Sequence, residues 1–116
     1  MNWLDMTEKE MLNIINPIMD DLMKASTDID YEKHVKDFSK RMKEILTKEN
    51  LEKQCKEYQK KLDCFSTREL IGTVRKDTDV RIFWKQWHTK SKNEFLAFVH
   101  IVEQNGKLEV VNASVS

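Results

Sequence analysis

The stretch that decides the fold is Leu96-Ala97-Phe98-Val99-His100-Ile101-Val102, followed by Asn105-Gly106 and then by Leu108-Glu109-Val110-Val111-Asn112-Ala113-Ser114-Val115. Asn-Gly between two runs of β-branched and aromatic residues is typical of a β-hairpin, because a type I′ turn needs a positive φ at both loop residues. With this dipeptide as the loop, the pairing register follows by counting outward, and we expect His100 to lie opposite Val111.

Alternation along each strand sorts the side chains of this hairpin onto two faces. One predicted face holds Ala97, Val99, Ile101, Leu108 and Val110, with Asn112 and Ser114 toward its far end. The other holds Leu96, Phe98, His100, Val102, Val111, Ala113 and Val115. Both faces are largely apolar, whereas an antiparallel sheet with one face in solvent has a polar side. We therefore expect helices on one face, without knowing which, and a pocket wall or a subunit interface on the other.

Length and charge restrict the class of protein. The chain has 116 residues, enough for one domain, and its 20 basic residues balance its 20 acidic ones. This balance gives no reason to expect nucleic acid or an anionic membrane as a partner. The N-terminus shows no signal-peptide pattern and no apolar run has the length of a membrane span, so we expect a cytoplasmic protein. We expect Cys55 and Cys64 to be reduced thiols.

The first half of the chain has the apolar periodicity of helices. Thr7-Glu8-Lys9-Glu10 is a capping box, and the apolar stripe behind it continues in phase across Pro17 to Ala25. We expect one kinked helix there, a connection over residues 26–30, a second helix from Tyr31 to about Leu46 and a third helix capped by Thr47. Three helices therefore precede the strands.

The second half changes to the period of strands. Residues 70–74 and 80–88 are predicted strands, separated by a turn, and the hairpin supplies two more. Helices followed by an antiparallel meander indicate the α+β class. The predicted protein is a single domain over residues 1–116, with helices over about 7–62 and a curved antiparallel sheet of about four strands over about 65–115.

This order resembles the nuclear-transport-factor-like superfamily of cystatin-like, cone-shaped α+β domains, and more narrowly its small uncharacterised bacterial members. The matching residues are Asp30-Tyr31, Phe38-Ser39, Met42, Leu46-Thr47, Leu51, Val80-Arg81-Ile82-Phe83-Trp84 and Asn105-Gly106-Lys107-Leu108-Glu109-Val110. The resemblance covers roughly residues 8 to 115 and consists of apolar spacing and turns. It implies a sheet that wraps the long first helix, a pocket for a small apolar molecule in the mouth of the cone, and dimers formed through the outer face of the sheet. Some relatives are isomerases, dehydratases or cyclases with an Asp, His or Tyr in the pocket, but a shared fold does not carry an activity over.

The candidate site residues are aromatic or histidine side chains of the predicted strands. His100 and His88 are weak candidates for a general base, whereas His34 is predicted to lie on a helix surface. The residues proposed for a ligand pocket or an interface are Trp84, Trp87, Phe83, Phe98, His100 and Asn112. Trp84 and Trp87 differ by an odd number of positions, so we expect them on opposite faces of their strand. We find no metal-ligand spacing, phosphate loop or nucleophile motif, and therefore expect no cofactor and no metal.

These patterns favour a non-catalytic domain that dimerises through its sheet and binds a small apolar ligand or peptide in a pocket between helices and sheet. One alternative is a small enzyme of the isomerase or dehydratase type, with His100 or His88 as general base. Another alternative is a protein-interaction module whose second sheet face receives a different partner. An enzyme needs a carboxylate or tyrosine within hydrogen-bond reach of the histidine inside a closed cavity.

Overall fold

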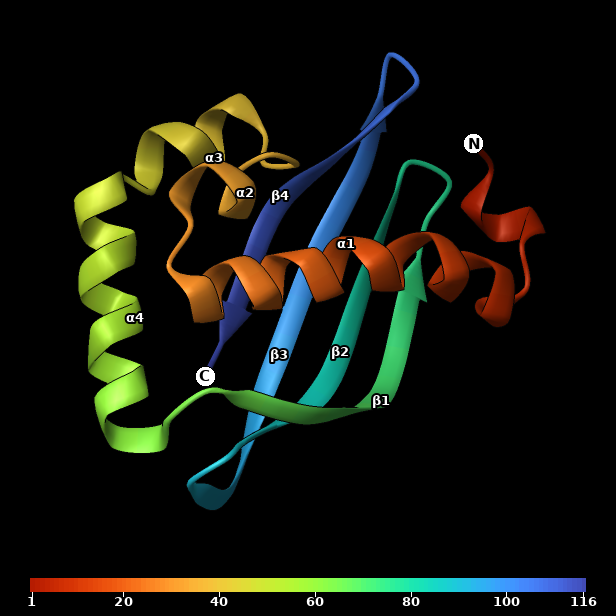
Figure 1. Ribbon diagram of the computed structural model, residues 1–116. Helices are drawn as coiled ribbons and strands as arrows, with labels where there is room; N and C mark the ends of the chain where they lie inside the picture. The colour runs from red at the N-terminus through yellow and green to blue at the C-terminus, as the bar shows by residue number, and fades with distance from the viewer.

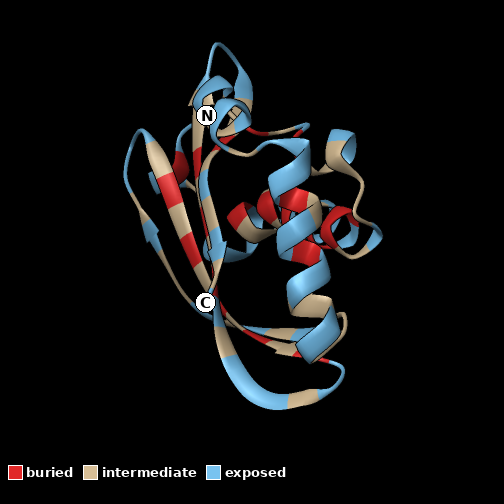
Figure 2. Cartoon of the chain, turned by 90° about the vertical axis from the view of Figure 1, so that its left-hand side faces the viewer, coloured by how far each residue is buried: buried red, intermediate tan, exposed pale blue.

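The computed structural model describes residues 1–116 and has the predicted α+β class (Figure 1). A single antiparallel sheet has the strand order β1-β2-β3-β4. The helices all lie against one face of this sheet, and nothing in the chain covers the other face (Figure 2). The elements are η1 (Trp3–Asp5), α1 (Glu8–Asp28), α2 (Tyr31–His34), α3 (Lys40–Ile45), α4 (Lys48–Leu62), β1 (Phe65–Arg75), β2 (Asp79–His88), β3 (Ser91–Gln104) and β4 (Lys107–Val115).

Helix α1 forms as the sequence predicts at its start and continues further at its end. The Glu10 amide donates to Thr7 Oγ1 over 3.1 Å and the Thr7 amide donates to Glu10 Oε1 over 3.2 Å, which is the predicted capping box. The helix runs through Pro17 and ends where Ile29 takes a left-handed conformation with φ 52°. The predicted connection over residues 26–30 is therefore confirmed only at residues 29–30, because residues 26–28 complete the last turn of α1.

The predicted single helix from Tyr31 to Leu46 is also wrong, because the chain forms two short helices, α2 and α3. Between them, the Val110 amide of β4 donates to the Asp37 carbonyl over 2.7 Å, and the Ser39 amide donates to the Val110 carbonyl over 2.9 Å. Ser39 then caps α3 by accepting from the Met42 amide. Pairing of residues 37–39 with the sheet thus takes backbone groups that a continuous helix would use.

The alternation along β2 distinguishes the two faces of the sheet: an inner side, which faces the helices, and an outer side, which does not. Its residues alternate between buried and half-buried, and the buried set is Val80, Ile82, Trp84, Gln86 and His88. The inner face of β3 adds Ala97, Val99 and Ile101, which pack with the α1 stripe of Met11, Ile15, Met19 and Met23 in one core cluster. Trp87, on the other parity, faces outward, as predicted from its odd spacing to Trp84.

The β3–β4 hairpin has the predicted turn, with φ of 54° at Asn105 and 76° at Gly106. The predicted register holds from Gln104 opposite Lys107 to Ile101 opposite Val110. An irregularity then shifts the pairing by one residue, so His100 lies opposite Asn112 and not opposite Val111.

This shift exchanges the two faces over the last part of β4. Ala113 and Val115 lie on the inner side with Val99 and Ala97, opposite which they pair. Asn112 and Ser114 lie on the outer side, opposite His100 and Phe98. The predicted facing of these four residues is therefore wrong, and the extra residue of a β-bulge is the physical reason.

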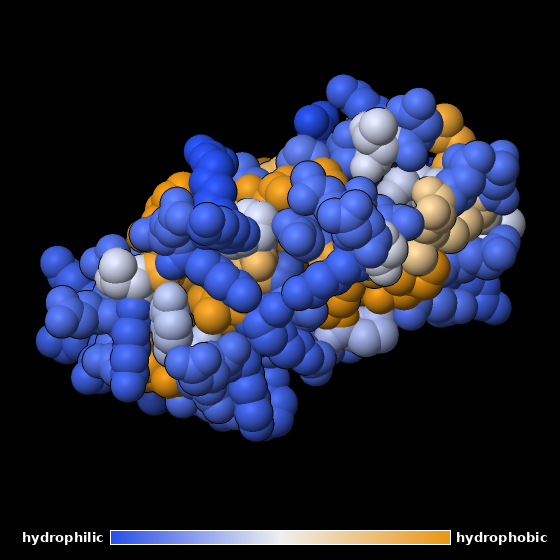
Figure 3. Space-filling view, turned by 90° about the horizontal axis from the view of Figure 1, so that it is seen from above, coloured by the Kyte–Doolittle hydropathy of each residue, from blue (hydrophilic) through white to orange (hydrophobic).

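The outer side remains partly apolar. Ile71, Val74 and Leu96 are each more than 40 % exposed on strands β1 and β3. The surface seen from above also shows apolar side chains between charged and polar ones (Figure 3).

Candidate functional site

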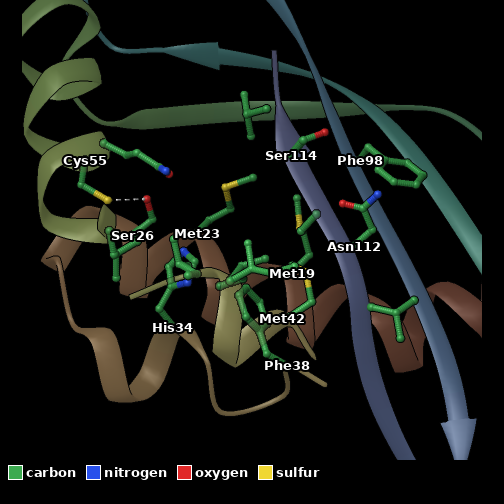
Figure 4. Close-up of a pocket in the computed structure, with 18 of the residues that line it drawn as sticks. Met19, Met23, Ser26, His34, Phe38, Met42, Cys55, Phe98, Asn112 and Ser114 are labelled. Atoms are coloured by element: carbon green, nitrogen blue, oxygen red, sulfur yellow. Dashed lines mark hydrogen bonds between the residues drawn. The ribbon is translucent and has the colours of Figure 1, made fainter. Parts of the chain in front are cut away.

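A pocket of about 570 Å³ opens between the helices and β4 (Figure 4). Its volume lies within the range of about 300 to 1,000 Å³ that is common for small-molecule sites. Met19 and Met23 of α1, Met42 of α3 and Leu51 of α4 form much of its apolar wall. Methionine side chains adapt to ligands of different shape, which makes such a wall suitable for binding without strict shape selection.

A hydrogen-bond network joins α1 to α4 at one end of the pocket. Ser26 Oγ lies 2.8 Å from Tyr58 Oη and 3.4 Å from Cys55 Sγ. The Gln59 side-chain amide donates to the Ser26 and Thr27 carbonyls in the last turn of α1, where carbonyls lack partners within the helix. The Ser26 carbonyl also accepts from the Ile29 amide, so the network adds a second partner there and joins α4 to the end of α1.

Burial keeps the ionisable members of this network neutral. It raises the pKa of the Cys55 thiol, although the hydrogen bond with Ser26 acts in the opposite direction. Burial also raises the pKa of Tyr58. A thiolate is the reactive form of cysteine, so a buried thiol with a raised pKa is a poor nucleophile. Both cysteines of the chain, Cys55 and Cys64, are free.

His34 belongs to the pocket wall, which overturns its predicted position on a helix surface. Its ring meets Phe38 edge to face, with 5.4 Å between the ring centroids. Burial lowers the pKa of His34 from 6.5 to about 4, so the ring is neutral at pH 7. The buried Nδ1 atom has no hydrogen-bond partner. The ring therefore contributes to the wall mainly through its packing against Phe38, with its Nδ1 atom buried beneath the surface.

Strand β4 lines the pocket with five consecutive residues, 111–115. Side chains of a strand alternate between its two faces, so one face alone supplies every second residue. Consecutive residues show that the pocket meets the edge of β4 as well as both of its faces. Phe98 of β3, on the outer side, also lines it. The pocket therefore extends around the edge of the sheet.

The residues predicted for a pocket or an interface lie in three parts of the structure: the pocket, the core and the outer side of the sheet. Phe98 and Asn112 line the pocket. Trp84 lies in the core, with the Arg68 guanidinium 5.1 Å above its ring. Phe83 and Trp87 lie on the outer side, where the Phe83 ring packs 5.1 Å from that of Phe98.

His100 also lies on the outer side, opposite Arg81 and Asn112 on the neighbouring strands. Its Nε2 is 3.0 Å from Asp79 Oδ1. Hydrogen bonds from Thr78 and then from His100 lower the pKa of Asp79. This histidine–carboxylate pair is geometrically suited to proton transfer, but His100 is not among the residues that line the pocket of 570 Å³.

His88 is enclosed by aromatic rings, those of Tyr58, Phe65 and Phe95, at centroid distances of 5.8, 5.0 and 4.8 Å. Burial lowers its pKa, and its Nδ1 atom has no hydrogen-bond partner. A base in such a site has neither a carboxylate to orient it nor access to a substrate.

No cluster of three or more His, Cys, Asp or Glu side chains is arranged to hold a metal ion. The helices also lack the combined length and hydropathy that crossing a bilayer requires. Comparison with known protein families and with curated proteins finds no match for the chain.

The sequence patterns missed the pocket residues of the helices. Ser26, His34, Cys55 and Tyr58 are distant in sequence, and contacts between α1, α2 and α4 bring them together. Tyr58 and Cys55 belong to the apolar stripe of α4, which indicates that they face inward. Nothing in that stripe indicates the hydrogen-bond partner Ser26.

The lowered pKa of His34 predicts a pH dependence of stability. Between pH 6.5 and about 4, the unfolded chain binds a proton at this ring that the folded chain does not bind. The free energy of unfolding should therefore decrease as the pH falls through this range, and His34→Gln should reduce this decrease. Urea denaturation of both proteins at pH 7, 6, 5 and 4 measures this free energy of unfolding. The pH dependence that remains in the variant includes the contribution of His88, whose pKa is also lowered. Equal slopes for the variant and the wild type would contradict the burial of His34.

Proposed function

We propose that this chain is a non-catalytic binding domain that takes a small apolar ligand or a peptide in the pocket between its helices and its sheet. We further propose that it forms a homodimer through the outer side of the sheet and acts in the cytoplasm. The observation that carries the proposal is the pocket itself, whose walls are rich in methionine and leucine. The α+β order and a pocket between helices and sheet also support the resemblance to the nuclear-transport-factor-like superfamily.

Binding has more support than catalysis because the three groups of the pocket that could act as a base or a nucleophile, His34, Cys55 and Tyr58, are held neutral. The pKa of His34 is lowered by burial, and those of Cys55 and Tyr58 are raised by it. None of the three forms an ion pair or hydrogen bond with a carboxylate. A neutral group of this kind orients a ligand by hydrogen bonding, whereas general-base catalysis needs a base with a pKa near the working pH.

The isomerase or dehydratase alternative draws support from the hydrogen bond between His100 and Asp79. The pair lies on the outer side of the sheet, away from the enclosed cavity that such chemistry uses to exclude water. His88, the other candidate base, is shielded by three aromatic rings. Both positions favour structural roles for these histidines.

The outer side of the sheet supports the dimer. Leu96 is exposed there, and three half-buried aromatic side chains lie on the same side of the sheet, which no helix covers: Phe83, Trp87 and Phe98, the last of which also borders the pocket. Exposed apolar patches of this kind mark interaction sites, and aromatic side chains are frequent anchors of interfaces. A two-fold dimer would place the same patch of each copy against the other. The alternative of a protein-interaction module would use the same surface for a different protein.

A substitution at the pocket rim tests ligand binding. Ile45 lines the pocket and is 57 % exposed, so Ile45→Lys places a charge beside the ligand without entering the core. Complete burial of an isoleucine side chain is worth about 1.5 to 3 kcal/mol, and a ligand could bury only the exposed part of Ile45, so the loss of this contact should weaken binding by about 1 kcal/mol or more, roughly fivefold or more. Fluorescence titration with the neutral apolar dye Nile red measures the affinity.

The matched control for this titration is Leu4→Lys, at an apolar residue of η1 that is 55 % exposed and does not line the pocket. It should bind the dye as the wild type does. Absence of dye binding by the wild type, or equal weakening by both variants, would contradict the pocket as a ligand site.

A substitution on the outer side tests the dimer. Light scattering across a dilution series should give a mass about twice 13.9 kDa for the wild type. Leu96→Lys introduces a charge at a residue that is 42 % exposed, and should shift the protein to monomer at the same concentrations, because two such charges would meet at a two-fold interface. Leu4→Lys should remain dimeric. A wild type that is monomeric at every concentration would refute the dimer and leave the outer side for a different partner.

A further inference from the structure

We propose that the ligand of the pocket is an extended peptide segment that pairs with the free edge of β4 as an additional strand of the sheet. This proposal rests on the proposed function and narrows it from any apolar ligand to one with a peptide backbone. Strand addition of this kind supplies affinity through main-chain hydrogen bonds and selectivity through alternate side chains.

The hydrogen-bond pattern of β4 shows which backbone groups are free. Ser116 and Leu96 exchange both of their backbone hydrogen bonds, at 2.8 and 3.0 Å. In an antiparallel ladder such pairs alternate, so Ser114 and Asn112 also direct their N–H and C=O groups toward β3. Ala113 and Val115, which lie between them, direct theirs away from β3. No backbone hydrogen bond outside the sheet involves either residue.

The first part of β4 shows that this edge accepts a partner. Val110 directs its N–H and C=O outward, and both bond to the segment 37–39 in a parallel bridge. That segment leaves the edge at Ser39 to begin α3. The outward groups of Ala113 and Val115 come next along the same edge, and the pocket begins there. A peptide in the pocket would extend a pairing that residues 37–39 begin.

The free stretch of β4 also lacks two of the features by which proteins protect an edge, namely charged side chains and proline. Residues 111–116 contain no charged residue and no proline. The opposite edge strand, β1, has two register irregularities and carries Arg68, Glu69 and Arg75. Strand β4 has one irregularity, after Val110, but its pairing is regular from Asn112 to Val115 and this stretch is uncharged. The contrast in charge indicates that β4 presents its edge to a partner, whereas β1 is charged as an unpaired edge usually is.

The surroundings determine the composition of the peptide. Side chains on the inner side of the added strand would face Met19, Met23 and Leu51, and those on the outer side would lie beside Asn112 and Ser114. Alternating apolar and polar residues fit these two environments. The chosen probe is therefore the uncharged peptide acetyl-Val-Thr-Val-Thr-Val-amide, and its control is the same peptide methylated at every backbone nitrogen.

Amide hydrogen exchange, followed residue by residue by nuclear magnetic resonance, tests the proposal. In the free protein, the amides of Ala113 and Val115 should exchange rapidly and those of Asn112 and Ser114 slowly. The probe should slow exchange at Ala113 and Val115, whereas the methylated peptide should not bind. Slow exchange at Ala113 and Val115 in the free protein would overturn the proposal, since the edge would already be paired, for example with a second copy.

A protein variant provides an independent test. Ala113→Pro removes the outward N–H without removing a bond to β3, which an edge strand tolerates. It should weaken binding of the probe by about tenfold or more, whereas Ala113→Ser, which keeps the N–H, should bind as the wild type does. If circular dichroism shows that Ala113→Pro is unfolded, strand pairing is tested by comparing the binding of the methylated and unmethylated peptides to the wild type. Equal binding of the methylated and unmethylated peptides would overturn strand pairing.

Titration with Nile red distinguishes failure of the strand pairing from failure of the pocket as a ligand site. Binding of the dye without binding of the peptide would preserve the pocket as an apolar ligand site and overturn the strand pairing. Absence of binding by both would overturn the proposed function together with this inference.

Discussion

The packing of α1 against one face of the sheet is the interaction on which the rest of the structure depends. The stripe from Met11 to Met23 meets alternate residues of β2 and β3, and these residues are almost completely removed from solvent. Burial of apolar surface is the main favourable contribution to folding, so a shift of β2 by one residue would exchange its core and solvent faces at great cost. All helices of the chain lie against this one face. No helix covers the outer side, which carries aromatic residues and is open to solvent or to a partner.

Two local departures from regular structure create the pocket beside this core. Residues 37–39 pair with β4 at Val110 and thereby divide the second helical segment into α2 and α3, which stand over one end of the cavity. The register shift after Val110 then turns Ala113 and Val115 inward, on the stretch of β4 that residues 37–39 do not reach. Bulges are frequent next to functional sites because they redirect side chains and end pairing. Here both departures meet at the same residue, and the pocket begins where the pairing stops.

Local signals were sufficient to predict several parts of this structure. The Asn105-Gly106 turn, the capping box at Thr7 and the opposite facing of Trp84 and Trp87 depend on residues that are near neighbours in sequence, and all three are confirmed. The break at residues 35–39 depends on contacts with a segment about 70 residues further along the chain, and the shift in register begins after Val110, the residue that makes them. Helical periodicity and strand alternation carry no information about such contacts. For the same reason, the pocket positions of Ser26 and His34 could not be predicted, whereas those of Phe98 and Asn112 were included among the candidates.

The sheet has a closed inner side, and we propose that its outer side meets a second copy of the chain. Fluorine nuclear magnetic resonance of the protein labelled with 5-fluorotryptophan tests both parts, because Trp3 and Trp84 are buried whereas Trp87 lies on the outer side. The account predicts that the Trp87 resonance shifts or broadens as the protein is diluted, while the other two stay fixed and insensitive to exchange of water for deuterium oxide. A Trp84 resonance that responds to dilution or to solvent would contradict the assignment of the two sides.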